Sequence, residues 1–301
     1  MVDALSMQAP SSAELINHAG LHRKSRVETA MLFGLSLPGI VVIFVALVLP
    51  VGLMMYLSFI GADGSLSLEN YMRIWESPIY GKVFGITFTV AFATTAIVVL
   101  VGYPLAYFLS QLSDRASSIA MIGVLMPFWT AVLVRTYAWL ILLQDGGIIN
   151  DTLMHLGVIS ERLHLANNLT GTLIGMSHVM LPFLVLPLYA SMKSIDPNLM
   201  SAASNLGARP SRAFWDIFFP LSMPGLLSGA LIVFVLCLGF YVTPAVLGGG
   251  RVIMIAMRIE ANVSIYSNWG AASSLGMVLI AITAVLLLVA YQISKLGGGA
   301  K

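Results

Sequence analysis

Long apolar blocks separated by short polar segments dominate the pattern of this chain. Six of the blocks are each long enough to cross the roughly 30 Å hydrocarbon core of a bilayer as a helix. They predict membrane spans near residues 32–60, 83–110, 119–143, 171–192, 224–247 and 274–294. No fixed-period repeat and no large polar block interrupts them. We therefore expect an all-α, polytopic protein with one membrane domain over residues 31–295.

The two ends of the chain are polar. Residues 1–30 end in the basic cluster Arg23-Lys24-Ser25-Arg26, and we expect them to form a disordered cytoplasmic tail. The apolar run that follows is too long for a cleavable secretory signal. Residues 296–301 form a short C-terminal tail, to which we assign no role.

The composition agrees with a membrane protein. Of 301 residues, 58% are hydrophobic and 9% are charged, whereas soluble domains carry about 25% charged residues. The net charge of +2 gives no indication of nucleic-acid binding. The single cysteine, Cys237, lies in an apolar run, which is typical of a buried, inert thiol.

Enzymatic chemistry has little support in the sequence. The 5 histidines have no metal-ligand spacing. No G-x-x-x-x-G-K-[ST] motif is present, so the chain cannot hydrolyse ATP by that route on its own. We expect no catalytic residue, metal site or cofactor in this chain.

The distribution of basic residues predicts an orientation, because cytoplasmic loops are enriched in Lys and Arg. With the N-terminus in the cytoplasm, nine of the 15 basic residues fall in cytoplasmic segments and five in outer loops. The remaining one, Arg135, lies inside the third span. This orientation places both termini and the polar segment 196–225 in the cytoplasm.

The segment 196–225 reads as a helix–turn–helix elbow. Asp196 is a suitable N-cap, Pro197 fits the first helical position, and Gly207 fits the left-handed residue that ends a helix. A second helix is expected from Pro210, with Pro220 ending it. The small pair Ala202-Ala203 would let another backbone approach closely. On these signals alone, an interfacial hairpin joining two membrane helices is an equal alternative.

The order of small and helix-breaking residues in this elbow resembles the EAA loop of ABC-importer permeases. The matching residues are Ala202, Ala203, Gly207, Ile217, Pro220, Pro224 and Gly225. Ser201 stands where that family usually has Glu, and Phe219 where it usually has Leu, so one polar contact expected of the family is missing.

The resemblance implies the type I ABC importer permease fold, with six transmembrane helices and a cytoplasmic coupling helix. In that family the first helix of the elbow docks into a cytoplasmic ATPase. The residues that it assigns to ATPase coupling are Ser201, Ala202, Ala203, Leu206, Gly207 and Ala208.

Two further segments narrow the resemblance within these permeases. The stretch 127–139 reads PFWTAVLVRTYAW, and the stretch 241–250 reads YVTPAVLGGG. Both are similar to the first permease subunit of the spermidine/putrescine group, as are Gly102–Ala106 and Asn268–Ala272. This implies a polyamine such as putrescine or spermidine as cargo. Other relatives carry amino acids, 4-aminobutyrate or aminophosphonates, which remain alternatives.

The resemblance also implies an assembly in the bacterial inner membrane. Its parts are a second permease subunit, two ATPases that bind ATP and Mg, and a periplasmic substrate-binding protein. The lipid bilayer is the remaining partner, and no nucleic acid is involved.

Arg135 is the charged residue within the predicted spans, where an unpaired charge costs a few kcal/mol or more. It extends toward the outer interface, lines an aqueous path or anchors a neighbouring helix. Trp129, Tyr137 and Trp139 form either an interfacial aromatic belt or the wall of that path. Tyr241 and Thr243, before the Pro244 kink, are further pathway candidates, although they also fit an ordinary helix end.

No carboxylate lies in a predicted span. Those in the outer loops are explained as solvated loop charges without further function: Asp63, Glu69, Glu76, Asp145, Asp151, Glu161 and Glu260. If the cargo is a cation, Asp145, Asp151 and Glu260 are the candidates for its entrance. Deeper in the membrane, cation–π contact with aromatic rings would replace carboxylates.

Two other classes of function remain open. A secondary transporter driven by protons or sodium usually needs an intramembrane acid or histidine, and here His178 stands alone in the spans. An intramembrane enzyme needs a nucleophile–base pair or a metal set, and the spans contain neither. The pattern favours the importer permease over both.

Overall fold

The computed structural model describes residues 12–61 and 63–298. These residues are largely helical and contain no strand, only an isolated bridge between Ile60 and Leu66. The all-α prediction is therefore confirmed. The predicted tails extend beyond the described part at residues 1–11 and 299–301. By its internal packing the chain divides into two units, Met1–Tyr56 and Leu57–Lys301.

Helix α1 runs from Ser12 to Ser58 and contains Pro38 and Pro50. It forms the described part of the first unit, and only its last two residues belong to the second. Its apolar part, Gly34–Ser58, is one of the candidate membrane spans. The helix begins inside the segment that we expected to be disordered. That expectation is wrong for residues 12–30, where the Ser-Ala-Glu-Leu start provides good helix formers without a proline or glycine that would break the first turns.

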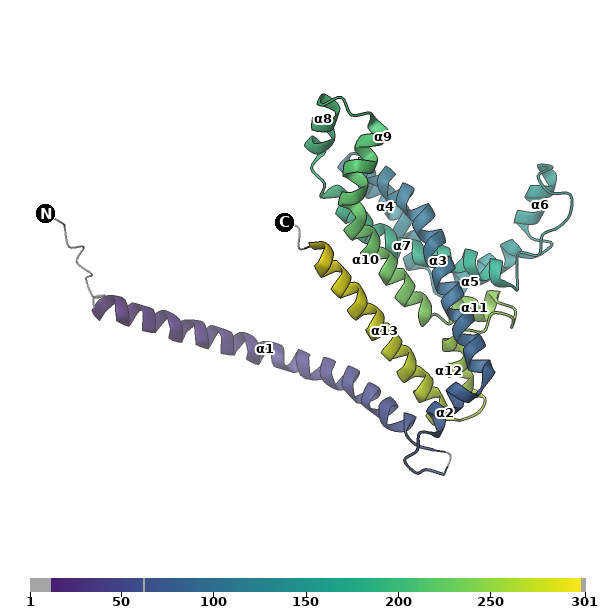
Figure 1. Ribbon diagram of the computed structural model, residues 1–301, viewed down its shortest axis with the longest axis horizontal. Coiled ribbons are helices and arrows are strands. Elements are labelled where there is room, and N and C mark those ends of the chain that lie inside the picture. Colours follow the sequence, from purple (N-terminus) through teal and green to yellow (C-terminus); the bar gives the residue numbers. More distant parts are fainter. Residues whose placement is uncertain (1–11, 62, 299–301) are drawn as a thin grey trace. The chain divides into compact units, whose positions relative to one another are not determined.

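The second unit contains the remaining helices, which Figure 1 labels. They are α2 (Glu69–Glu76), α3 (Pro78–Gln111), α4 (Asp114–Leu125), the 3₁₀ turn η1 (Met126–Trp129), α5 (Val132–Leu143), α6 (Ile148–His155), α7 (Leu169–Lys193), α8 (Pro197–Asn205), α9 (Pro210–Ala213), the π-helical turn η2 (Phe214–Phe218), α10 (Phe219–Leu238), α11 (Val242–Leu247), α12 (Ile255–Ser264) and α13 (Trp269–Gly298).

Six helical stretches within the described residues are long and apolar enough to cross a membrane, which is the number expected, but the third of them is Val132–His155 rather than 119–143. Helices α3, α7 and α10 pack against one another and form the centre of the second unit. Buried side chains of all three meet there, including Val98, Met180 and Val233. Small residues bring α10 close to α7, since a Cβ on Gly229 would lie 3.0 Å from the Leu184 carbonyl oxygen.

The third predicted span is interrupted, which the sequence reading did not anticipate. Helix α4 ends at Leu125, η1 carries the chain through Pro127, and α5 begins only at Val132. The Pro127 ring restricts the residue before it and removes a backbone donor, which favours a break at this point. The fifth span also ends earlier than expected, because α10 stops at Leu238.

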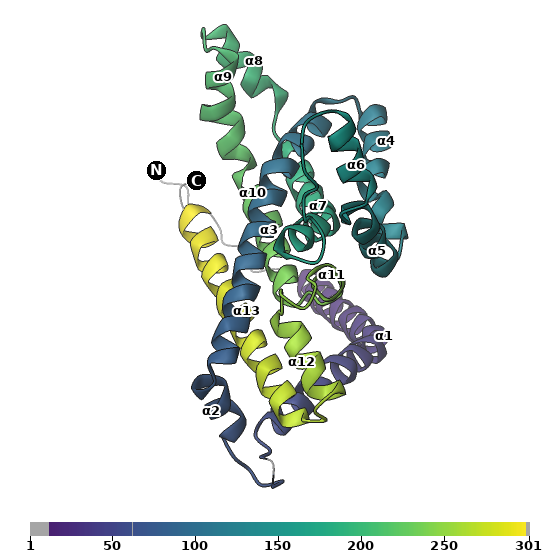
Figure 2. The same cartoon turned by 90° about the vertical axis from the view of Figure 1, so that its right-hand side faces the viewer.

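The two ends of the second unit carry different elements. Figures 1 and 2 place α8 and α9 at one end and α2 and α12 at the opposite end. The chain order requires this separation, because α10 leads from α9 across the unit toward α11 and α12. The end with α8 and α9 is called the elbow end below, and the other is called the far end.

Candidate functional site

The elbow begins with the predicted cap. The Asp196 carboxylate accepts a hydrogen bond from the backbone N–H of Asn198 at 2.9 Å, and Pro197 occupies the first position of α8. The carboxylate thus satisfies one of the free N–H groups at the start of the helix.

The end of α8 is a Schellman turn built around glycine. Gly207 has a φ of +84°, and its N–H donates to the Ser204 carbonyl. The Ala208 N–H donates to the Ala203 carbonyl at 3.0 Å. This pair of bonds fixes the direction in which the chain leaves the helix. Gly207 is therefore required for its backbone conformation rather than for space, because nothing lies within 4 Å of a Cβ built there.

The second arm of the elbow does not stop at Pro220, and that prediction is wrong. Helix α9 passes into the π-helical turn Phe214–Phe218 and then directly into α10. A proline inside an α-helix clashes with the carbonyl four residues earlier. The π turn widens the helix immediately before Pro220, which offers a physical reason for its position. The elbow is consequently continuous with the fifth span, over Pro210–Leu238.

Aromatic rings fix this arm to α3. The Tyr107 ring meets Phe214 and Phe218 edge to face, at centroid distances of 5.3 and 5.1 Å. One turn earlier on α3, the Tyr103 hydroxyl lies 2.9 Å from the Ser222 hydroxyl. Edge-to-face pairs add about 0.5–1.5 kcal/mol beyond the burial of the rings. The arm is thus held rigidly against the centre of the unit.

The predicted coupling residues divide between an exposed face and a buried one. Ser201, Ala202 and Gly207 are exposed, Ala208 is half-buried, and Leu206 projects with 88% of its surface exposed. Ala203 is instead buried, so the expected Ala202-Ala203 patch presents only its first residue. We call Ser201, Ala202, Leu206 and Gly207 the elbow face. The sequence reading missed Trp215, which is 60% exposed on the second arm.

The Ser201 side chain is exposed, and its hydroxyl forms a long hydrogen bond within α8. Its hydroxyl donates to the Pro197 carbonyl of its own helix at 3.4 Å. The position where related loops carry Glu therefore holds a side chain that is already engaged within α8.

A second polar set lies where α5, α7 and α11 meet. The indole N–H of Trp139 donates to Nδ1 of His178 at 3.2 Å, with the two rings near perpendicular. Arg135 lies one helical turn before Trp139, and its Nε is buried without a hydrogen-bond partner, as is the hydroxyl of Ser177. The sequence reading treated His178 as isolated; its position within an apolar span was the signal that it has a partner.

Thr243 on α11 contacts this region through Thr136 rather than through Trp139 or His178. It is completely buried, and its hydroxyl lies 3.3 Å from that of Thr136 on α5. Tyr241, two residues earlier, remains 39% exposed. We call Arg135, Thr136, Trp139, His178 and Thr243 the intramembrane polar set.

The other aromatic candidates lie outside that set. Trp129 is 77% exposed in η1, and Tyr137 is 53% exposed on the outward side of α5. The structure pairs Trp139 with His178 and Thr243 with Thr136, and it leaves Trp129, Tyr137 and Tyr241 on the surface of this chain.

The loop carboxylates each have a partner within this chain, and Arg162 links the backbone of Asp145 to the Asp151 carboxylate. Asp145 bonds to His164 at 3.0 Å, Asp151 pairs with Arg162 at 3.1 Å, and Glu260 accepts from the Ser264 hydroxyl at 2.7 Å. All three carboxylates are exposed. In the loop after α1, the Ser65 hydroxyl and N–H hold the pKa of the Asp63 carboxyl below its usual value. No group of three His, Cys, Asp or Glu side chains suited to a metal ion occurs in the part of the chain that the structure describes.

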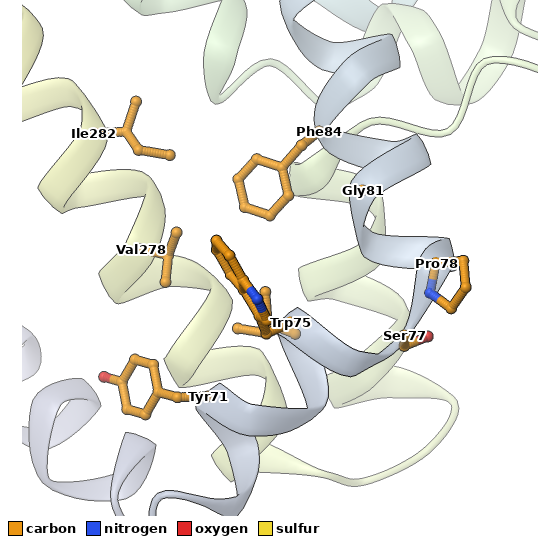
Figure 3. A pocket seen from close by; sticks show the side chains of 9 residues that line it. Tyr71, Trp75, Ser77, Pro78, Gly81, Phe84, Val278 and Ile282 are labelled. Atoms are coloured by element: carbon orange, nitrogen blue, oxygen red, sulfur yellow. The ribbon is translucent and has the colours of Figure 1, made fainter.

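A hollow of about 610 Å³ lies away from both the elbow face and the intramembrane polar set. It is formed by α2, the start of α3 and α13, and Figure 3 shows the Trp75 ring reaching toward Val278. Its lining is almost entirely apolar and contains none of the predicted site residues. It lacks the polar groups that would orient a small charged solute.

Comparison with known proteins identifies the chain. It is 31% identical over 250 residues to the spermidine/putrescine transport system permease protein PotB of Haemophilus influenzae, covering 81% of this chain and 87% of PotB. The chain belongs to the PotB family of ABC transporter permeases. PotB of Escherichia coli is likewise 31% identical, with 76% of this chain and 83% of that protein covered. This permease is thus a membrane subunit of an ABC importer and contains no nucleotide-hydrolysing motif of its own.

Other relatives extend the comparison. The chain is 24% identical to a putative 2-aminoethylphosphonate transport system permease protein, PhnU, of Salmonella typhimurium, over 78% of this chain and 82% of that protein. No model of a protein family matches the chain. Among solved structures, a bacterial alginate ABC transporter in complex with its alginate-bound periplasmic protein contains a chain with a TM-score of 0.74 and 16% identity, covering 90% of this permease and 96% of that chain. That likeness supports the type I permease fold.

Proposed function

We propose that this permease forms half of the translocation pathway for a polyamine such as putrescine or spermidine, or for a related small amine. The observation that carries the proposal is the 31% identity to PotB across 81% of the chain. A second permease subunit would complete the pathway, two cytoplasmic ATPases would bind ATP and Mg, and a periplasmic protein would deliver the cargo.

The elbow face is the part of this chain proposed to dock into an ATPase. Leu206 is its most exposed apolar side chain, and Gly207 and the Asp196 cap fix the helix that presents it. The continuous helix over Pro210–Leu238 then provides a lever into the membrane. When the two ATPases close around nucleotide, the elbows would be drawn together and the pathway would open outward; hydrolysis would return it to the inward-facing state.

The orientation follows from this docking. With the elbow end in the cytoplasm of a bacterial inner-membrane protein, the far end faces the periplasm. The excess of Lys and Arg in the elbow-side segments supports the same orientation, with both termini cytoplasmic.

The chemistry of the membrane helices bears on how a cation would pass. Helices α3, α5, α7, α10 and α13 contain no Asp or Glu. The exposed rings of Trp129, Tyr137 and Tyr241 remain available for cation–π contact with an ammonium group, on surfaces that a second permease would complete. Asp145 and Glu260 are proposed as entrance carboxylates.

The 24% identity to PhnU keeps an aminophosphonate as a second candidate cargo. The decisive experiment is a titration of the reconstituted complex with cognate periplasmic protein loaded in turn with putrescine, spermidine, 4-aminobutyrate or 2-aminoethylphosphonate. Stimulation of ATP hydrolysis by a polyamine-loaded form alone is the expected result. Stimulation only by the phosphonate-loaded form would move the cargo to the second candidate.

A further inference from the structure

Three basic side chains at the far end lie along one seam between α3 and the segment 251–262. The backbone N–H of Ile255 donates to the Thr87 hydroxyl at 2.9 Å, which attaches the start of α12 to α3. Lys82 and Arg251 line one hollow of about 420 Å³ beside this attachment. Farther along α12, the Arg258 guanidinium lies 5.7 Å from the ring centre of Tyr80 on α3. We call Lys82, Arg251 and Arg258 the basic seam.

The seam lacks acidic partners. No carboxylate lines the hollow, and no ion pair within the described residues involves Lys82, Arg251 or Arg258. The nearest acid along α12, Glu260, forms no ion pair with any of the three among the described residues, and it accepts a hydrogen bond from the Ser264 hydroxyl. Uncompensated positive charge in a concave surface attracts an anionic group and accelerates its association.

Part of the seam is rigid and has unused donors. Arg258 lies between the rings of Tyr80 and Tyr266, at 5.7 and 5.6 Å from their centres. Its Nε is buried without an acceptor, and one turn later so is the amide nitrogen of Asn262, a residue that is only 4% exposed. Buried donors of this kind normally have an acceptor, and neither of these two has one among the described residues.

We propose that the basic seam is the docking surface for an acidic loop of the periplasmic substrate-binding protein, with a carboxylate entering the hollow between Lys82 and Arg251. This inference rests on the proposed function, which places the far end in the periplasm. The sign of the charge favours a protein partner over the cargo, because the seam repels a polyamine. Electrostatic pairing at such an interface mainly sets the association rate and its dependence on salt.

The test uses the whole complex in nanodiscs of zwitterionic lipid, with ATP hydrolysis measured against the concentration of cargo-loaded binding protein. For K82E and R251E we expect the half-stimulating concentration to rise about tenfold or more at low salt, with weaker salt dependence and unchanged basal hydrolysis. K82R should retain most of the response. R115E is the matched control, because Arg115 is an exposed cation of α4 outside the seam and belongs to none of the ion pairs among the described residues.

The possible outcomes distinguish failure of the docking surface from failure of the proposed function. If wild-type hydrolysis responds to the loaded binding protein but K82E and R251E respond within about twofold of it, the seam is not the docking surface. If the variants change hydrolysis without binding protein, and only in discs that contain anionic lipid, the seam binds a lipid headgroup and the inference is overturned. If the wild type does not respond to any loaded form, the proposed function itself fails, and the docking surface with it.

Discussion

The indole N–H of Trp139 on α5 donates a hydrogen bond to Nδ1 of His178 on α7, across a distance of 3.2 Å within the membrane domain. Because Nδ1 accepts, the proton of the neutral imidazole is on Nε2. The bond attaches the second half of the broken third span to the central helices, beside the contact of Thr136 with Thr243.

The first prediction concerns this bond. W139F keeps an aromatic ring but removes the donor, so the complex should lose about 0.6 kcal/mol of stability, the average for hydrogen bonds between membrane helices. SDS-induced unfolding would measure it. W129F is the matched control, because Trp129 is 77% exposed and has no hydrogen bond among the described contacts. A double-mutant cycle of W139F with H178A that yields no coupling energy would contradict the bond's contribution.

The second prediction concerns Gly207. A β-branched residue cannot adopt its φ of +84° without a cost of about 1–2 kcal/mol. G207V should therefore distort the end of α8 and reduce both ATPase binding and transport, while G207N, which tolerates this conformation, should retain most of both. Co-purification of the ATPase with the permease measures the first effect. Normal transport by G207V, in membranes with normal amounts of complex, would be evidence against the coupling role.

Adjacent alanines provide a third prediction. Ala203 is buried and Ala202 is exposed. A203L should overpack the inside of the elbow at a cost of about 1–3 kcal/mol, lowering the melting temperature of the permease. A202L should leave the melting temperature unchanged and weaken ATPase binding, because it changes only the elbow face. Equal effects of the two variants on both measurements would show that this division of the elbow is wrong.

The fourth prediction is that removal of the Ser201 hydroxyl has only a small effect on transport. Since its hydroxyl bonds to the Pro197 carbonyl within α8, S201A should leave ATP-driven transport within about twofold of wild type, as expected for a weak exposed hydrogen bond. A tenfold loss would mean that the hydroxyl leaves its helix to contact the ATPase.

The sequence predicted those features of the elbow that depend on local chemistry. Asp196 caps its helix, and Gly207 ends it, because both requirements are met by residues a few positions apart. Apolar length alone likewise predicted six membrane helices.

Features that depend on neighbouring helices were missed. Pro220 looked like a stop, but a π turn from Phe214 accommodates it, and the Tyr107 contacts that support this turn come from a helix about a hundred residues earlier in the chain. The partner of His178 could not be predicted from the sequence for the same reason, since Trp139 belongs to another span. Ala203 was assigned to the wrong face because the direction of α8 is set by packing rather than by its own sequence.

The most direct test of the central claim is uptake of labelled putrescine by proteoliposomes that contain the whole complex, with loaded binding protein outside and ATP inside. Uptake should require ATP on the elbow side, should be abolished by L206E on the elbow face, and should be unaffected by a protonophore or a sodium ionophore at fixed ATP. Uptake that persists without ATP, or that collapses with the ion gradient while ATP is held constant, would contradict an ATP-driven importer and favour an ion-coupled carrier.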